Sequence, residues 1–156
     1  MIGFRASTDR DAHYLIDIDL KCFDYAWLPE TWRGVSKTCV ACVATWNDTP
    51  VGMAIFGKTP DGDVEILKIA VKPAYRNHGI ARHLIYNCIL YAREVRAFRL
   101  VMLVPEGQLR PGEIGDISSW LGKLGFRAQV PLLKDYFIFY GQAEDGVIFS
   151  LPIPQA

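Results

Sequence analysis

The residues with the clearest chemistry in this sequence lie in one stretch, Val64 to Ile85, which reads as a strand, a turn and a helix. The β-rich run ends at Lys72-Pro73, because proline cannot donate to a strand ladder, and an amphipathic helical pattern begins just beyond Gly79. The first N–H groups of a helix have no intrahelical partner, so a glycine turn that leads into one is a receptor for a pyrophosphate. Arg76 and Arg82 add positive charge on either side of the turn.

This stretch resembles the acyl-CoA motif of the GNAT acetyltransferase superfamily, Arg/Gln-x-x-Gly-x-Gly/Ala at a strand-to-helix junction. Here the motif is Arg76-Asn77-His78-Gly79-Ile80-Ala81. The preceding Ile69-Ala70-Val71-x-Pro-x-Tyr and the helical apolar pattern that follows make the resemblance specific. It implies an α+β fold with a mixed, mostly antiparallel central sheet of about six to seven strands. About four helices should flank this sheet, and a splayed parallel pair should follow the motif strand.

The resemblance also implies that acetyl-CoA is the co-substrate. Its pantetheine arm would run beside the central strand, and its pyrophosphate would meet the backbone of the turn. The residues expected to bind it are Ile69, Ala70, Val71, Arg76, Asn77, His78, Gly79, Ile80, Ala81 and Arg82.

An amine acceptor is largely protonated at neutral pH, so acetyl transfer to it needs a base. Glu65 is the leading candidate, because it lies on the central strand and matches the general-base glutamate of histone-type members. Strand alternation places Glu65 on one face with Leu67 and Ile69, looking into the cleft. A solvated carboxylate at the end of a strand is the alternative interpretation. Glu106, just beyond the next strand, is a second candidate base.

The sequence departs from the ribosomal-protein alanine acetyltransferases at two catalytic positions. Leu103 stands where their base, a glutamate, is found, and Leu121 stands where their acid, a tyrosine, is found. Tyr136 and Tyr140 in the late strands are therefore candidates for acceptor binding or for protonating the thiolate. Packing tyrosines are the alternative.

Composition narrows the class of protein. The 156 residues suit a single domain over 1–156, and the 17 basic residues balance 17 acidic ones, so no nucleic-acid partner is expected. No apolar run approaches the roughly 20 residues of a membrane span, and the N-terminus has no leader pattern, so a soluble cytoplasmic protein with no membrane partner is expected. The four cysteines include Cys39 and Cys42, which strand geometry places on opposite faces. We therefore expect no metal site.

The elements that must position these residues follow from hydrophobic periodicity and turn residues. Strands are expected at 2–5, 37–46, 51–58, 64–71, 99–104, 126–139 and 147–153, and helices at 9–22, 79–95 and 114–124. Residues 23–33 should form a loop with a short helix beginning at Pro29. The strands on either side of the helix at 79–95 should be parallel, with a right-handed crossover.

Together these features predict an N-acetyltransferase that moves an acetyl group from acetyl-CoA to a primary amine by direct attack in a ternary complex. The tyrosine-bearing hairpin slightly favours a protein N-terminus or lysine as acceptor over a small-molecule amine. A non-catalytic acyl-CoA-binding module is a further alternative, favoured by Leu103 and Leu121. The oligomeric state is left open, with a homodimer as one option.

Overall fold

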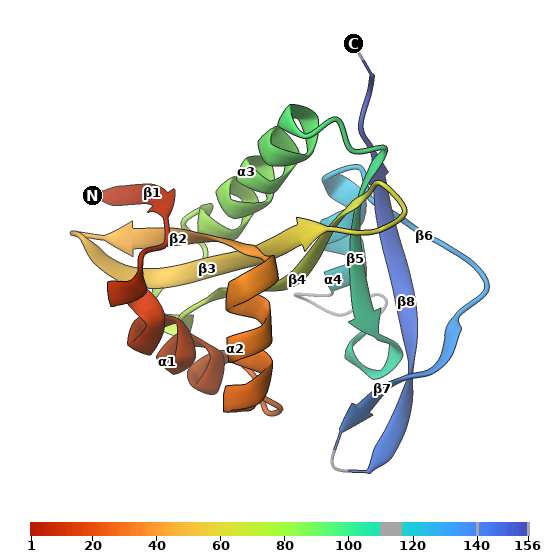
Figure 1. The fold of residues 1–156 in the computed structure, drawn as a ribbon, viewed down its shortest axis with the longest axis horizontal. Coiled ribbons are helices and arrows are strands. Elements are labelled where there is room, and N and C mark those ends of the chain that lie inside the picture. Colours follow the sequence, from red (N-terminus) through yellow and green to blue (C-terminus); the bar gives the residue numbers. More distant parts are fainter. Residues whose placement is uncertain (110–116, 140, 156) are drawn as a thin grey trace.

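The computed structural model describes residues 1–109, 117–139 and 141–155 and contains one mixed sheet with helices on both faces (Figure 1). The helices are α1 (Ala12–Cys22), α2 (Pro29–Thr38), α3 (Ile80–Glu94) and α4 (Ile117–Lys123). The strands are β1 (Ile2–Ala6), β2 (Val40–Trp46), β3 (Thr49–Lys58), β4 (Val64–Val71), β5 (Arg99–Pro105), β6 (Arg127–Ala128), β7 (Leu133–Phe139) and β8 (Gln142–Pro152). Short 3₁₀ turns lie at Asp9–Asp11, Pro73–Tyr75 and Glu106–Gln108.

The eight strands have the order β1-β2-β3-β4-β5-β8-β6, and β7 pairs with β8 outside this path. Among the described strands, β4 and β5 form the one parallel pair, and every other pair is antiparallel. This architecture confirms the expected α+β class and the parallel pair across the motif helix.

The sheet separates two hydrophobic cores. The larger core lies under α3 and α4 and includes Leu84, Cys88 and Leu121. The smaller core lies on the opposite face, where Leu15 and Ile18 of α1 pack on the central strands. In Figure 1, α1 and α2 accordingly lie on one side of the sheet and α3 on the other. None of the helices in the described part of the chain is long and apolar enough to span a membrane.

The parallel pair is short. Residues Val64–Ile66 of β4 pair with Leu100–Met102 of β5, and beyond them the two strands diverge, as Figure 1 shows. A β-bulge accompanies this divergence: Phe56 of β3 pairs with Ile66 and Ile55 pairs with Lys68, which leaves Leu67 without a partner on β3. An extra residue in one strand bends that strand away from its neighbour. The gap between the carboxyl halves of β4 and β5 is therefore built into the sheet.

Two boundaries differ from the sequence prediction. Residues Lys37 and Thr38 end α2 instead of opening a strand, because the helix that begins at Pro29 continues for ten residues and packs Trp32 and Val35 on the smaller core. The helix is thus longer than the short one expected after Pro29.

The late strands also differ. The run expected at 126–139 is two strands, β6 and β7, separated by a segment that contains Pro131, which cannot donate to a ladder. Strand β8 begins at Gln142, so residues 142–146, expected in a connection, pair with β7 instead.

Candidate active site

A cavity of about 420 Å³ lies where β4 ends and α3 begins. All the residues expected to bind acetyl-CoA line it, with the exception of His78. Cys22, Phe23, Tyr75, Ile117 and Trp120 complete its wall. We call this the cofactor cavity.

The turn at the mouth of the cofactor cavity has the backbone geometry that an anion site requires. Gly79 caps α3 with a φ of 76°, in the left-handed region, and a Cβ built on it would meet no protein atom within 4 Å. The space beside Gly79 is therefore open where the 15-residue helix begins, and the first residues of that helix line the cavity. The Arg76 guanidinium donates through Nε to the carbonyl of Val71 at 2.9 Å, which ties the turn to the end of β4.

His78 has a different surrounding from the other turn residues. Its Nδ1 lies 3.1 Å from the carbonyl oxygen of Tyr75 and 2.9 Å from that of Arg76, and its ring meets the Trp46 ring edge-on. A nitrogen that close to two carbonyl oxygens must carry the proton and donate. His78 thus stabilises the turn by hydrogen bonds to its backbone, from outside the cofactor cavity.

A second cavity, of about 620 Å³, lies on the other side of the gap between β4 and β5, and we call it the acceptor cavity. It shares Cys22, Phe23, Ile69 and Ile117 with the cofactor cavity, so the two spaces meet at the gap. Its walls come from the loop between α1 and α2, from the bulged part of β4, from β5 with the turn that follows it, and from the β7–β8 hairpin. The charged, amide and aromatic side chains on these walls are Phe23, Asp24, Tyr25, Trp27, Lys68, Gln108, Phe137, Phe139 and Glu144.

Because of the β-bulge at Leu67, Glu65 faces a different side of the sheet from Ile69. Its neighbours Val64 and Ile66 are buried in the larger core, so Glu65 points to the opposite face of the sheet. Ile69 packs against the larger core, because the extra residue Leu67 interrupts the alternation. The expectation that Glu65 and Ile69 share a face is therefore wrong, and Glu65 instead shares its face with Lys68.

Glu65 is half-buried and does not line either cavity. Burial raises the pKa of its carboxyl above the ordinary value. Burial also raises the pKa of Tyr136, and the negative charge of Glu65 contributes to this shift, so the phenol and the carboxylate lie near one another. Two candidates from distant parts of the sequence are thus within electrostatic range of one another, although neither lines either cavity.

The remaining candidates are Glu106 and Tyr140, and Leu103 and Leu121 mark the positions where related enzymes have a base and an acid. Glu106 is exposed and lines neither cavity, although the next residue, Gly107, does. Tyr140 lies outside the described residues. Leu103 lines the acceptor cavity, whereas Leu121 is fully buried in the larger core, where it contacts neither cavity.

Lys68 and Asp19 form a buried ion pair in the wall of the acceptor cavity, which sequence reasoning missed. Both side chains are almost inaccessible, and the Lys68 ammonium donates to Asp19 Oδ1. The ammonium also lies 4.5 Å from the centre of the Phe23 ring and 4.2 Å from that of Trp27. Burial lowers the pKa of Lys68, and the bond to Asp19 opposes that shift. A lysine inside the otherwise apolar part of β4 was the available signal.

Glu144 is the second residue that sequence reasoning missed. It faces Phe137 across the β7–β8 ladder, and its Oε1 accepts a hydrogen bond of 2.5 Å from the Gly107 backbone N–H. The hairpin and the turn after β5 are therefore joined at the cavity wall. The sequence offered no signal for this, because residues 142–146 read as a loop.

Cys39 and Cys42 lie on opposite faces of the sheet, as expected, but Cys39 precedes the strand instead of belonging to it. Cys42 belongs to the larger core, and Cys39, at the end of α2, packs against the smaller core on the other face. The four cysteines carry no disulfide, and no group of three metal-ligating side chains occurs among the described residues. The absence of a metal remains a prediction.

Comparisons with known proteins address the family and the fold. Residues 10–110 match the model of the "Acetyltransferase (GNAT) family". A comparison with curated proteins gave no match.

Solved structures give strong matches to the fold. The ribosomal-protein-S18-alanine N-acetyltransferase from Escherichia coli matches with a TM-score of 0.81 at 20% identity, over 100% of this chain and 96% of that one. Arabidopsis thaliana NAA60 in complex with acetyl-CoA matches with a TM-score of 0.81 at 19% identity, over 98% and 99% of the two chains. A GNAT family acetyltransferase from Elizabethkingia anophelis with acetyl-CoA bound matches with a TM-score of 0.74 at 20% identity, over 97% of each chain. At these identities the matches establish a shared fold.

Proposed function

The chain belongs to the GNAT acetyltransferase family, and from this premise we propose that it is an N-acetyltransferase that moves an acetyl group from acetyl-CoA to a primary amine. The observation that carries the proposal is the pair of cavities that meet at the gap between β4 and β5. One cavity opens at the N-terminus of α3 and suits the pyrophosphate and pantetheine arm. The other can present an amine to the thioester from the opposite side.

Transfer proceeds in this proposal by direct attack in a ternary complex. The neutral amine nitrogen attacks the thioester carbonyl carbon, a C–N bond forms, the C–S bond breaks, and the thiolate of CoA takes a proton. The nitrogen must lose its extra proton before it can attack, since primary amines are largely protonated at neutral pH. Glu65 is the proposed base and acts through water, because Glu65 itself does not line the acceptor cavity, whereas Leu67 and Lys68 of the same strand do.

Tyr136 is the proposed proton donor to the departing thiolate. A tyrosine phenol is protonated at neutral pH, and burial, together with the charge of Glu65, raises the pKa of Tyr136 further. Tyr140 keeps the same candidate role, and Glu106 stays the second candidate base. The bound acetyl-CoA in two of the matched structures supports the choice of co-substrate.

The test is a thiol-release assay with acetyl-CoA and a pooled set of amines that includes peptides with free N-termini, lysine peptides and small amines. Release of CoA that depends on an amine, with a mass gain of one acetyl group on that amine, is the expected result. Tight acetyl-CoA binding with no amine-dependent release would instead favour the non-catalytic acyl-CoA-binding module.

A further inference from the structure

We infer that the acceptor cavity selects a small primary ammonium that carries an aromatic or flat apolar group, with Glu144 as the carboxylate that holds the ammonium. This inference names the acceptor class of the proposed transfer, so it depends on the proposed function for the chemistry. It departs from the peptide acceptor that the hairpin tyrosines favour in the sequence.

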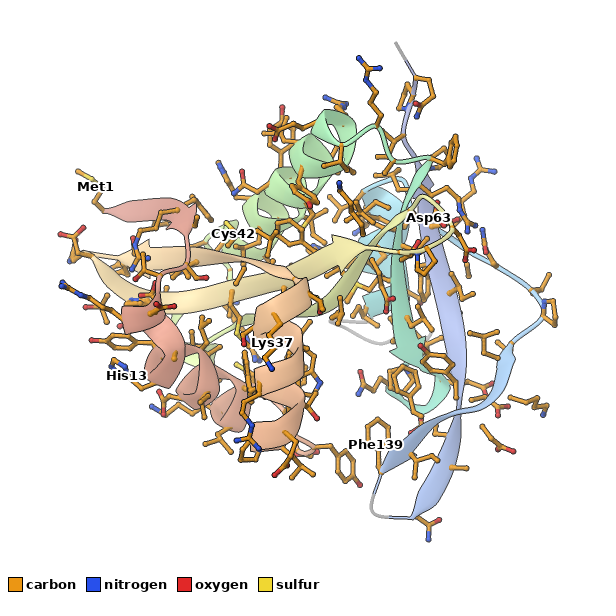
Figure 2. All side chains as sticks on the ribbon, viewed as in Figure 1. Met1, His13, Lys37, Cys42, Asp63 and Phe139 are labelled. Atoms are coloured by element: carbon orange, nitrogen blue, oxygen red, sulfur yellow. The ribbon has the colours of Figure 1, made fainter. Side chains whose placement is uncertain are left out.

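The walls of the acceptor cavity offer stacked aromatic rings. The Tyr25 and Phe139 rings have centroids 4.6 Å apart at an interplanar angle of 16°, and the Phe137 and Phe139 rings lie 5.7 Å apart at 9°. Figure 2 shows Phe139 at the end of the hairpin that lies toward α2. These rings stack on one another, and a flat apolar ligand can extend the stack by offset packing against the Phe137 ring, which lines the cavity. They also attract a cation through the ring quadrupole.

The charges on the walls favour a positive ligand. Lys68 already has its counter-ion in Asp19, and its ammonium contacts the Phe23 and Trp27 rings. Asp24 and Glu144 have no ion-pair partner among the residues that the structure describes. Within the described part of the chain these two carboxylates have no cationic side chain paired with them, so a bound ammonium can supply the opposite charge.

Glu144 is better placed than Asp24 to make this contact. Asp24 is exposed, whereas Glu144 is half-buried, and its carboxylate is held by the Gly107 N–H. Glu144 and Phe137 are cross-strand partners and so share a face of the hairpin. One carboxylate and one ring thus lie side by side on the same wall, as an arylalkyl ammonium requires.

The size of the ligand follows from the contact between Tyr25 and Phe139. Tyr25 belongs to the loop after α1 and Phe139 to the hairpin, so their stacking joins two walls of the cavity. The two walls are in contact at this point, so the space for a ligand is bounded there, which favours a small amine over an extended peptide. The volume of about 620 Å³ suits a small molecule.

Calorimetry without acetyl-CoA tests the inference at pH 7, where the amine is charged. The three ligands are 2-phenylethylammonium, the neutral 2-phenylethanol and the ring-free n-butylammonium. We expect 2-phenylethylammonium to bind at least about tenfold more tightly than either of the others. Glu144→Gln should remove the advantage over the alcohol, and Phe137→Leu should remove the advantage over n-butylammonium.

Asp145→Asn is the matched control. Asp145 follows Glu144 on β8 but does not line the cavity, and it pairs with Lys134 at 3.4 Å and with the Asp135 N–H at 2.9 Å. This control removes the same charge next to the site and should leave the three affinities unchanged. Equal binding of the alcohol and the ammonium, or an unchanged ammonium affinity in Glu144→Gln, would overturn the inference.

The thiol-release assay separates this inference from the proposed function. Release with glutamate or with peptides, but not with 2-phenylethylamine, would leave acetyl transfer intact and overturn the acceptor class. Charge-dependent binding of 2-phenylethylammonium that is lost in Glu144→Gln, without release from any amine, would uphold the site and overturn the transfer.

Discussion

The cofactor cavity and the acceptor cavity are neighbours, but they are built in different ways. The cofactor cavity takes most of its wall from one run of sequence, residues 69–82, in which a strand, a turn and a helix follow one another. The acceptor cavity takes its wall from segments as far apart as Asp24 and Glu144. A site made by consecutive residues can be recognised from their order, whereas a site made by distant residues depends on how the chain folds.

The two cavities also differ in what holds their walls together. The turn of the cofactor cavity is fastened by short-range bonds, such as Arg76 to the Val71 carbonyl. The acceptor cavity is fastened by long-range contacts, such as Lys68 with Asp19 and Glu144 with Gly107. Single substitutions should therefore have local effects on the first cavity and wider effects on the second.

The largest effect is expected on turnover, in Glu65→Gln on the central strand β4. If Glu65 is the base, this change should keep acetyl-CoA affinity and lower turnover by roughly 10²–10⁴-fold, the usual contribution of a positioned general base. The loss should shrink as pH rises, because the amine then arrives neutral. A pH profile of turnover measures both the loss at neutral pH and its decrease at high pH. Unchanged turnover at pH 7 would contradict the assignment of Glu65 as the base.

Glu106→Gln is the comparison for that experiment, because Glu106 is the second candidate base although it is exposed and lines neither cavity. A turnover loss in Glu106→Gln that shrinks as pH rises, with none in Glu65→Gln, would assign the base to Glu106 instead. Stability gives an independent reading of Glu65. Burial raises the pKa of the Glu65 carboxyl in the folded protein. The protonated Glu65 therefore contributes its full stability below the pKa of the unfolded state. This contribution is lost as pH rises through the pKa of the folded state. The unfolding free energy of Glu65→Gln should therefore exceed that of the wild type at neutral pH, with a gap that closes toward acid pH.

The next effect concerns the acceptor wall, in Asp19→Ala. This change leaves the buried Lys68 ammonium without its counter-ion. It also leaves the backbone N–H of Trp27 without Asp19 Oδ2, which accepts its hydrogen bond at 2.9 Å. Breaking a buried pair in this way costs about 3–5 kcal/mol of unfolding free energy. Urea denaturation measures it, and the KM for the amine should rise more than the KM for acetyl-CoA.

Asp17→Ala on the same helix is the control, because Asp17 is only partly buried and pairs with Lys21 and Lys72. The unfolding free energy of Asp17→Ala should differ little from that of the wild type. The double variant Asp19→Leu/Lys68→Met should recover most of the lost stability, since it removes both charges. A single Asp19→Ala variant as stable as the wild type would show that the pair does not hold the wall.

The smallest effect should be confined to the cofactor cavity, in Gly79→Val. A β-branched residue at a φ of 76° is strained, and its side chain would occupy the space that the helix N-terminus faces. We expect acetyl-CoA affinity to fall about tenfold or more, with acceptor binding unchanged, as measured by calorimetry. Gly141→Val is the control, because Gly141 has a φ of 80° and equally open space but lies in the hairpin. Equal acetyl-CoA affinity in Gly79→Val and Gly141→Val would contradict the claim that the turn at Gly79 binds acetyl-CoA.

Much of the fold could be predicted from local patterns. The motif strand, the left-handed glycine and the helix from Ile80 to Glu94 occur where alternation, proline and helical periodicity place them. The errors lie where tertiary contacts override such patterns. Lys37 and Thr38 continue a helix that packs on the smaller core, and residues 142–146 are strand because β7 lies beside them.

The sequence alone determined the family, the mixed sheet and the position of the cofactor turn, because these depend on residues that follow one another in the chain. The acceptor side was decided by the tertiary structure. The bulge at Leu67 turned Glu65 and Lys68 to one face, and pairing in the sheet brought Tyr136 near Glu65. Folding also placed Glu144 against Gly107 and Asp19 against Lys68, over separations of 37 and 49 residues. Contacts over such separations leave no periodic pattern in the sequence, since they arise when the two halves of the sheet diverge and loops from both sides cover the gap.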